Sequence, residues 1–170
     1  IQYNDKEETL DSAIHYLEIS GRYFEKDKDL ESLVYLSSNL GGIYLYKKDY
    51  TNALKYFELS YNGFQKLGYT EEFYACYNEL GITYLNLNDL NKSEFYLLKA
   101  YKESALDSFP KNDDELVKLD ASLYYNLGLL YVAKKDYKNA YAFLKKERSI
   151  TNAKNRVSYQ KELMDLTKSN

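Results

Sequence analysis

LGGIYL at residues 40–45, LGITYL at 80–85 and LGLLYV at 127–132 are three copies of one pattern: Leu-Gly, two residues, Tyr and an apolar residue. Five residues after its tyrosine, each copy has an aspartate followed by an apolar residue. The glycines are 40 and then 47 positions apart. The pattern therefore marks an internal repeat, and we place the additional residues of the longer spacing in an acidic connection around 108–114. A small residue follows in each copy, with a large apolar residue four positions later: Ala53 with Phe57, Ser93 with Leu97, and Ala140 with Leu144.

Apolar residues inside each copy recur at intervals of three and four. This is the period of an α-helix and not of a strand. Asp49, Asp89 and Asp136 stand where an N-cap is expected, because an aspartate side chain accepts hydrogen bonds from the free amides of a helix start. Gly68 is typical of a helix C-terminus. Each repeat is therefore predicted to contain two helices joined by a short turn.

Gly41, Gly81 and Gly128 fall in the middle of predicted helices, where glycine costs about 1 kcal/mol relative to alanine. A cost that recurs at one register indicates that two helices cross closely there. We expect the glycines to face the small residues of the second helix, which are Ala53, Ser93 and Ala140. The tyrosine three residues after each glycine is expected to fill the space beside the crossing.

Leu-Gly-x-x-Tyr followed by Ala and Phe within a helix–turn–helix resembles the tetratricopeptide repeat. The resemblance covers about residues 28–151, with a period longer than the roughly 34 residues usual for the family. It implies an all-α fold, a right-handed superhelical stack of antiparallel helix pairs forming an α-solenoid. The long period is similar to repeats in bacterial peptide-responsive regulators and in sensor regions.

We predict a single domain over residues 1–170. Residues 1–27 match the second helix of a truncated repeat, because Leu10, Ala13 and Leu17 lie 40 positions before Tyr50, Ala53 and Phe57. Full repeats are expected at 28–68, 69–108 and 109–153. Residues 154–170 are expected to form a terminal or capping helix, either the start of another unit or a helix along the groove. The natural chain is expected to extend further at its N-terminus.

The resemblance implies a concave groove lined by the first helix of each unit. Its predicted residues are mostly apolar, tyrosine or asparagine, and they do not form the lysine and arginine clamp with which some family members hold carboxylate tails. Asparagine suits a peptide backbone because it both donates and accepts hydrogen bonds. A protein or peptide ligand is expected, and Asn78→Ala and Tyr125→Ala are expected to weaken its capture with little effect on stability. The predicted groove residues are Tyr35, Ser38, Asn39, Tyr46, Asn78, Glu79, Ile82, Asn86, Ser122, Tyr125, Asn126 and Leu129. Alternatively, these residues pack against neighbouring repeats.

Composition argues against several other functions. The net charge of −3 and the absence of a basic block argue against nucleic-acid contact, and no apolar run reaches the roughly 20 residues of a membrane span. His15 is the only histidine and Cys76 the only cysteine, so we predict no enzyme, no catalytic residues, no metal site and no cofactor. Four acids are expected to be solvated near a helix start: Asp113, Asp114, Glu115 and Asp120.

Two functional hypotheses remain at this point. The first is the ligand- or partner-sensing region of a larger bacterial protein in signalling or transcription regulation. We expect it in the cytoplasm, or in a periplasmic or surface sensor. The second is a self-association module, a homodimer formed through the apolar face that the truncated first repeat leaves at Leu10, Ile14 and Leu17.

Overall fold

The computed structural model describes the backbone of residues 2–104 and 114–168 and the side chains of residues 8–104 and 120–152. Within these ranges the chain is helical and contains no β-strand, which confirms the predicted all-α class. The helices are α1 (Gln2–Asp27), α2 (Leu30–Tyr46), α3 (Tyr50–Leu67), the short 3₁₀ helix η1 (Thr70–Glu72), α4 (Phe73–Asn86), α5 (Leu90–Ser104), α6 (Asp114–Ala133) and α7 (Tyr137–Lys168).

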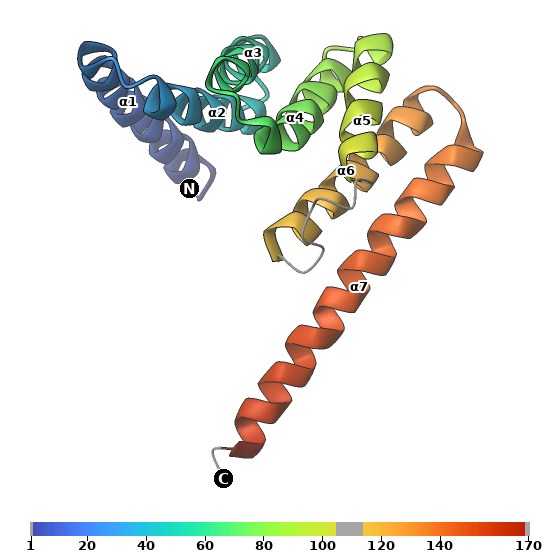
Figure 1. The fold of residues 1–170 in the computed structure, drawn as a ribbon. Coiled ribbons are helices and arrows are strands. Elements are labelled where there is room, and N and C mark those ends of the chain that lie inside the picture. Colours follow the sequence, from blue (N-terminus) through green and yellow to red (C-terminus); the bar gives the residue numbers. More distant parts are fainter. Residues whose placement is uncertain (1, 105–113, 169–170) are drawn as a thin grey trace.

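The helices pack as adjacent antiparallel pairs (Figure 1). The most extensive contacts join α2 with α3, α4 with α5, and α6 with α7. Smaller contacts join each pair to the next, α3 to α4 and α5 to α6, and α1 contacts α2 to a similar extent. The pairs therefore stack one after another as a solenoid, in which each pair contacts its neighbours in sequence.

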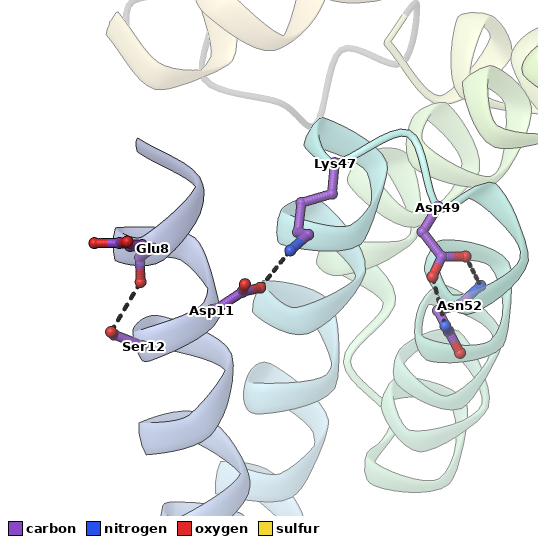
Figure 2. Close-up of polar contacts among 6 residues, drawn as sticks. All are labelled: Glu8, Asp11, Ser12, Lys47, Asp49 and Asn52. Atoms are coloured by element: carbon purple, nitrogen blue, oxygen red, sulfur yellow. Dashed lines mark hydrogen bonds and ion pairs between the residues drawn. The ribbon is translucent and has the colours of Figure 1, made fainter. Parts of the chain in front are cut away.

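One turn conformation closes all three pairs. In the first, Lys48 adopts a left-handed backbone with φ of 62°, and the amide of Asp49 donates to the carbonyl of Tyr44 at 2.9 Å. Asp49 Oδ1 then accepts from the amide of Asn52 at 3.2 Å (Figure 2). The turn thus ends one helix and caps the next, as the sequence predicted. The same arrangement occurs at Asn88–Asp89, at Lys135–Asp136 and, between α1 and α2, at Lys28–Asp29.

The recurring register of the glycines does mark close helix crossings. A Cβ atom placed on Gly41 would lie 2.5 Å from the ring of Phe57, and one on Gly81 would lie 2.5 Å from Cγ of Leu97. Gly128 meets Leu144 in the same way, at 2.6 Å. The predicted facing residues were wrong, however. The nearest neighbours are the large residues four positions after the small ones, because the missing side chain leaves a hollow that a large apolar side chain fills.

The tyrosine after each glycine stacks on a ring of the second helix. Tyr44 and Tyr56 lie with ring centroids 5.4 Å apart and planes 4° from parallel. Tyr84 with Tyr96, and Tyr131 with Phe143, form the same pair at 5.6 Å. Each within-pair interface therefore combines a glycine crossing with one stacked aromatic pair.

The structure differs from the sequence prediction at the end of the chain. A separate helix was expected over 154–170, whereas α7 continues from Tyr137 to Lys168 as a single helix and extends well past the packed helices (Figure 1). No glycine or proline lies between these residues, so no residue type that breaks helices interrupts it. The assignment of the whole chain to one truncated and three full repeats stays a prediction.

Candidate protein-binding surface

The first helices of the three pairs, α2, α4 and α6, lie on one side of the stack. Helices α4 and α6 contact each other directly, whereas no comparable contact joins α3 with α5 in the described part of the chain. The first helices therefore lie on the inner side of the bend at this point. We call the surface formed by the twelve predicted groove residues on these helices the groove face.

Most of the groove face is accessible. Tyr35, Tyr46 and Tyr125 expose 40%, 65% and 50% of their surface. Asn39, Asn86 and Ser122 are exposed, and Ser38, Glu79, Ile82 and Leu129 are partly buried. The amide of Asn86 donates to the carbonyl of Ile82 on its own helix at 2.8 Å.

Asn78 and Asn126 are buried and bond to each other. Nδ2 of Asn126 on α6 donates to Oδ1 of Asn78 on α4 at 2.9 Å, and Nδ2 of Asn78 donates to Oγ of Ser122 at 3.3 Å. The structure thus brings three predicted groove residues together in a hydrogen-bonded ladder between two first helices. The two asparagines therefore fit the alternative stated from the sequence, namely that groove residues pack against neighbouring repeats, because their side chains link α4 and α6.

The corresponding junction between α2 and α4 has different side chains. Counted from the glycines, Ser38 is the counterpart of Asn78, and Glu79 is the counterpart of Asn126. Glu79 is partly exposed as a residue, but its Oε2 is buried without a hydrogen-bond partner among the described residues. Burial, and secondly the neighbouring Glu72, raise the pKa of Glu79 to about 8.

Two further carboxylates lie at these junctions and receive tyrosine hydroxyls. Tyr35 Oη of α2 donates to Glu72 Oε1 at 3.0 Å, and Tyr74 Oη of α4 donates to Asp120 Oδ1 at 2.8 Å. The prediction that Asp120 is a solvated acid was wrong: it is partly buried, and burial raises its pKa despite the hydrogen bond from Tyr74. Glu72 was missed because it precedes α4 and has no counterpart in the repeat pattern. Asp113 lies outside the described residues, as do the side chains of Asp114 and Glu115.

Lysines are concentrated on the second helices. Neither α2 nor α4 contains lysine or arginine, and the only one in α6, Lys118, has a side chain outside the described ranges. On α5, Lys99 Nζ lies 4.5 Å from the ring centroid of Phe95, and on α7 Lys146 Nζ lies 5.1 Å from that of Tyr101. These lysines belong to the second helices but lie over rings of both helices of a pair, because Lys99 Nζ is also 5.1 Å from the ring centroid of Tyr77 and Lys146 Nζ is 5.3 Å from that of Tyr124.

Among the described residues, neither His15 nor Cys76 belongs to a catalytic or metal-binding group. His15 is exposed, with its ring 5.8 Å from that of Tyr16. Cys76 is buried, and burial raises the pKa of its thiol to about 12, so the side chain remains a thiol that packs and not a nucleophilic thiolate. Among the described residues no group of three or more potential ligands could hold a metal ion, and no helix is long and apolar enough to cross a membrane.

The sequence profile of the tetratricopeptide repeat matches residues 36–62, 74–105 and 121–146. Each match corresponds to one of the three helix pairs, and together they cover half of the chain. The chain belongs to the tetratricopeptide repeat family. Tetratricopeptide repeats generally mediate protein–protein interaction, and the fold is typically a non-catalytic scaffold.

A solved structure supports the same fold. The crystal structure of BtubC (BKLC) from P. vanneervenii superposes with a TM-score of 0.70 and 20% sequence identity, over 89% of this chain and 60% of that chain. The present chain thus spans about 60% of the length of this relative. No curated protein sequence matches it significantly.

Proposed function

We propose that the groove face binds a segment of another protein, and that the chain is the partner-sensing region of a larger bacterial regulatory protein. The observation that carries the proposal is the exposure of Tyr35, Tyr46 and Tyr125 on the groove face. Tyrosine presents a large apolar ring and a hydroxyl at low cost in conformational entropy, and it is enriched at protein interfaces.

Apolar and polar contacts alternate along this surface. Ile82 and Leu129 are partly buried and can cover apolar side chains of a ligand, while Asn39 and Ser122 are exposed and can bond its backbone. A few anchoring pockets with surrounding polar contacts are the usual requirement for peptide recognition. The regulatory role rests on the similarity of the long repeat to bacterial sensor regions. We place the protein in the cytoplasm, with a periplasmic or surface sensor as the alternative.

The test is selection of ligands from a random peptide library displayed on phage, followed by measurement of Kd for the selected peptides. Tyr125→Ala is expected to weaken binding at least tenfold, about the effect of removing one interface anchor. Tyr141→Ala is the matched control, since Tyr141 is at least as accessible, with 68% of its surface exposed against 50% for Tyr125, but lies on the second helix α7. Selected peptides that bind both variants as tightly as the unaltered protein would place the binding surface elsewhere.

A second candidate function is self-association through α1. Tyr16 and Tyr23 are exposed on this helix, and a shallow depression beside them is lined by Ile19, Arg22, Tyr23 and Lys26. Leu10, Ile14 and Leu17, which the sequence predicted to be uncovered, are partly buried. Sedimentation equilibrium over a range of concentrations tests this role: a dimer that dissociates in Tyr16→Ser/Tyr23→Ser supports it, and a monomer at all concentrations excludes it.

A further inference from the structure

Charge is distributed unevenly between the two sides of the stack. Within α2, α4 and α6, and in η1 just before α4, the charged side chains that the structure describes are acids: Glu31, Glu71, Glu72, Glu79 and Asp120. The lysines nearest to the ends of these helices are paired elsewhere. Lys47 contacts Asp11 of α1 (Figure 2), and Lys134 Nζ lies 2.6 Å from Glu94 of α5.

The hydrogen bonds that these acids receive do not neutralise them. Glu72 and Asp120 accept from tyrosine hydroxyls, which are neutral donors. Both residues therefore remain acidic groups beside the first helices, where a bound ligand would meet them. Because Tyr35 contributes its hydroxyl to Glu72 while 40% of its own surface is exposed, an apolar ring and an acidic group stand side by side on this face.

Glu79 is the member of this group with a side-chain oxygen, Oε2, that has no hydrogen-bond partner among the described residues. The ladder between α4 and α6 satisfies the amides of Asn78 and Asn126, but at the equivalent position between α2 and α4 the buried Oε2 of Glu79 is left unpaired. A buried carboxyl oxygen without a donor is costly, and a cationic donor would relieve that cost more effectively than a neutral one. Glu79 is partly exposed as a residue, and its register places it on the predicted groove side of α4.

We propose that the groove face is specific for a basic protein segment, in which a lysine or arginine donates to Glu79 while neighbouring apolar side chains pack on the exposed tyrosine rings. This inference rests on the proposed function and names the class of partner. Charge complementarity favours it over an acidic segment, because the charged side chains described within the first helices and η1 are all acids, and an acidic ligand would be repelled by Glu72 and Asp120.

The same random library provides the test. Selected peptides are expected to be enriched in lysine and arginine, and replacing the critical lysine by norleucine should weaken binding to the unaltered protein about tenfold. The replacement should have little effect on binding to Glu79→Gln, because that variant cannot form the carboxylate that a bound cation would stabilise at Glu79. Glu58→Gln is the matched control: Glu58 lies on α3 and accepts from Tyr84, so this variant should retain the full effect of the lysine. Circular dichroism establishes that both variants are folded.

The outcomes separate the two proposals. Peptides that depend on Tyr125 but show no enrichment in basic residues, or that bind Glu79→Gln as well as the unaltered protein, would overturn the basic-segment inference and leave the proposed function standing. An absence of binders, or binders insensitive to every groove-face variant, would overturn both proposals. Occupation of the face by a second copy of the chain would appear as dimerisation that Tyr125→Ala abolishes, and it too would overturn both.

Discussion

Two junctions between first helices use the same sequence positions relative to their glycines but differ in their chemistry. Between α4 and α6, Asn78, Ser122 and Asn126 satisfy one another. Between α2 and α4, the equivalent positions hold Ser38 and Glu79, and the carboxyl oxygen of Glu79 has no partner among the described residues. The backbone contact between α4 and α6 also has no comparable counterpart between α2 and α4 in the described part of the chain. In a repeat protein, the approach of two first helices and the side chains at one register can thus together decide whether neighbouring repeats are joined by hydrogen bonds.

The largest expected effect concerns the pH dependence of stability. The pKa of Glu79 is about 8 in the folded protein, above its ordinary value in the unfolded chain, so the unfolded state loses its proton first as pH rises. The free energy of unfolding is therefore expected to fall between about pH 4.5 and 8, by roughly 2–4 kcal/mol from this group. Below this window the Glu79 carboxyl group is protonated in both the folded and the unfolded state, and above it the group is ionised in both. Urea denaturation at several pH values measures the change.

Glu79→Gln should remove most of this pH dependence. Asp120, whose pKa burial also raises, accounts for a smaller slope of the same sign in the variant. The capping aspartates Asp49 and Asp136 have lowered pKa values and act only at more acidic pH. If the difference in unfolding free energy between the variant and the unaltered protein stayed constant from pH 5 to 8, Glu79 would not be held in the buried state described here.

A medium effect is expected when the ladder is broken. Asn78→Ala leaves the buried amide of Asn126 without its acceptor, and a loss of about 1–3 kcal/mol in unfolding free energy is expected. This replaces the sequence-based expectation that Asn78→Ala leaves stability unchanged. Ser38→Ala, at the same register in the other junction, should change stability by less than about 0.5 kcal/mol. Equal losses in the two variants, measured by urea denaturation, would remove the distinction between the junctions.

The smallest effect tests whether α2 has free space beside the open junction. A Cβ atom at Gly42 would meet nothing within 4 Å, so Gly42→Ala should raise the unfolding free energy by about 1 kcal/mol through its greater helix propensity. Gly41→Ala is the control on the same helix, and it should be destabilising because its Cβ would meet the ring of Phe57. Thermal denaturation compares the two, and a lower Tm for Gly42→Ala would mean that this side of α2 is covered.

The sequence predicted most of the fold because local rules decide it. A recurring mid-helix glycine indicates a close crossing, and an aspartate before an apolar residue indicates a helix start, whatever lies elsewhere in the chain. The partner of each glycine was less predictable. Helical period places Ala53 and Phe57 on one face of α3, but the fit of side chains across the crossing determines which of them meets Gly41.

The candidate site was predicted less completely for a related reason. The spacing placed Asn78 and Asn126 on the groove side of their helices, but it could not indicate that α4 and α6 approach closely enough for the two amides to bond. Glu72 gave no signal because it lies before α4. Glu79 was included in the predicted groove, yet its unpaired oxygen depends on the absence of a donor on a neighbouring helix, which no single-helix pattern contains.

The short turns that close the helix pairs limit where this chain tolerates a change in length. The left-handed residue and the capping aspartate are adjacent, so one residue inserted between them would rotate the following helix by about 100° and turn its apolar stripe toward water. The start of a first helix is more permissive: α6 begins fourteen residues before Gly128, whereas α4 begins eight before Gly81. An engineer who wished to lengthen the binding surface would therefore graft residues onto the beginnings of α2, α4 or α6 and leave the aspartate turns unaltered.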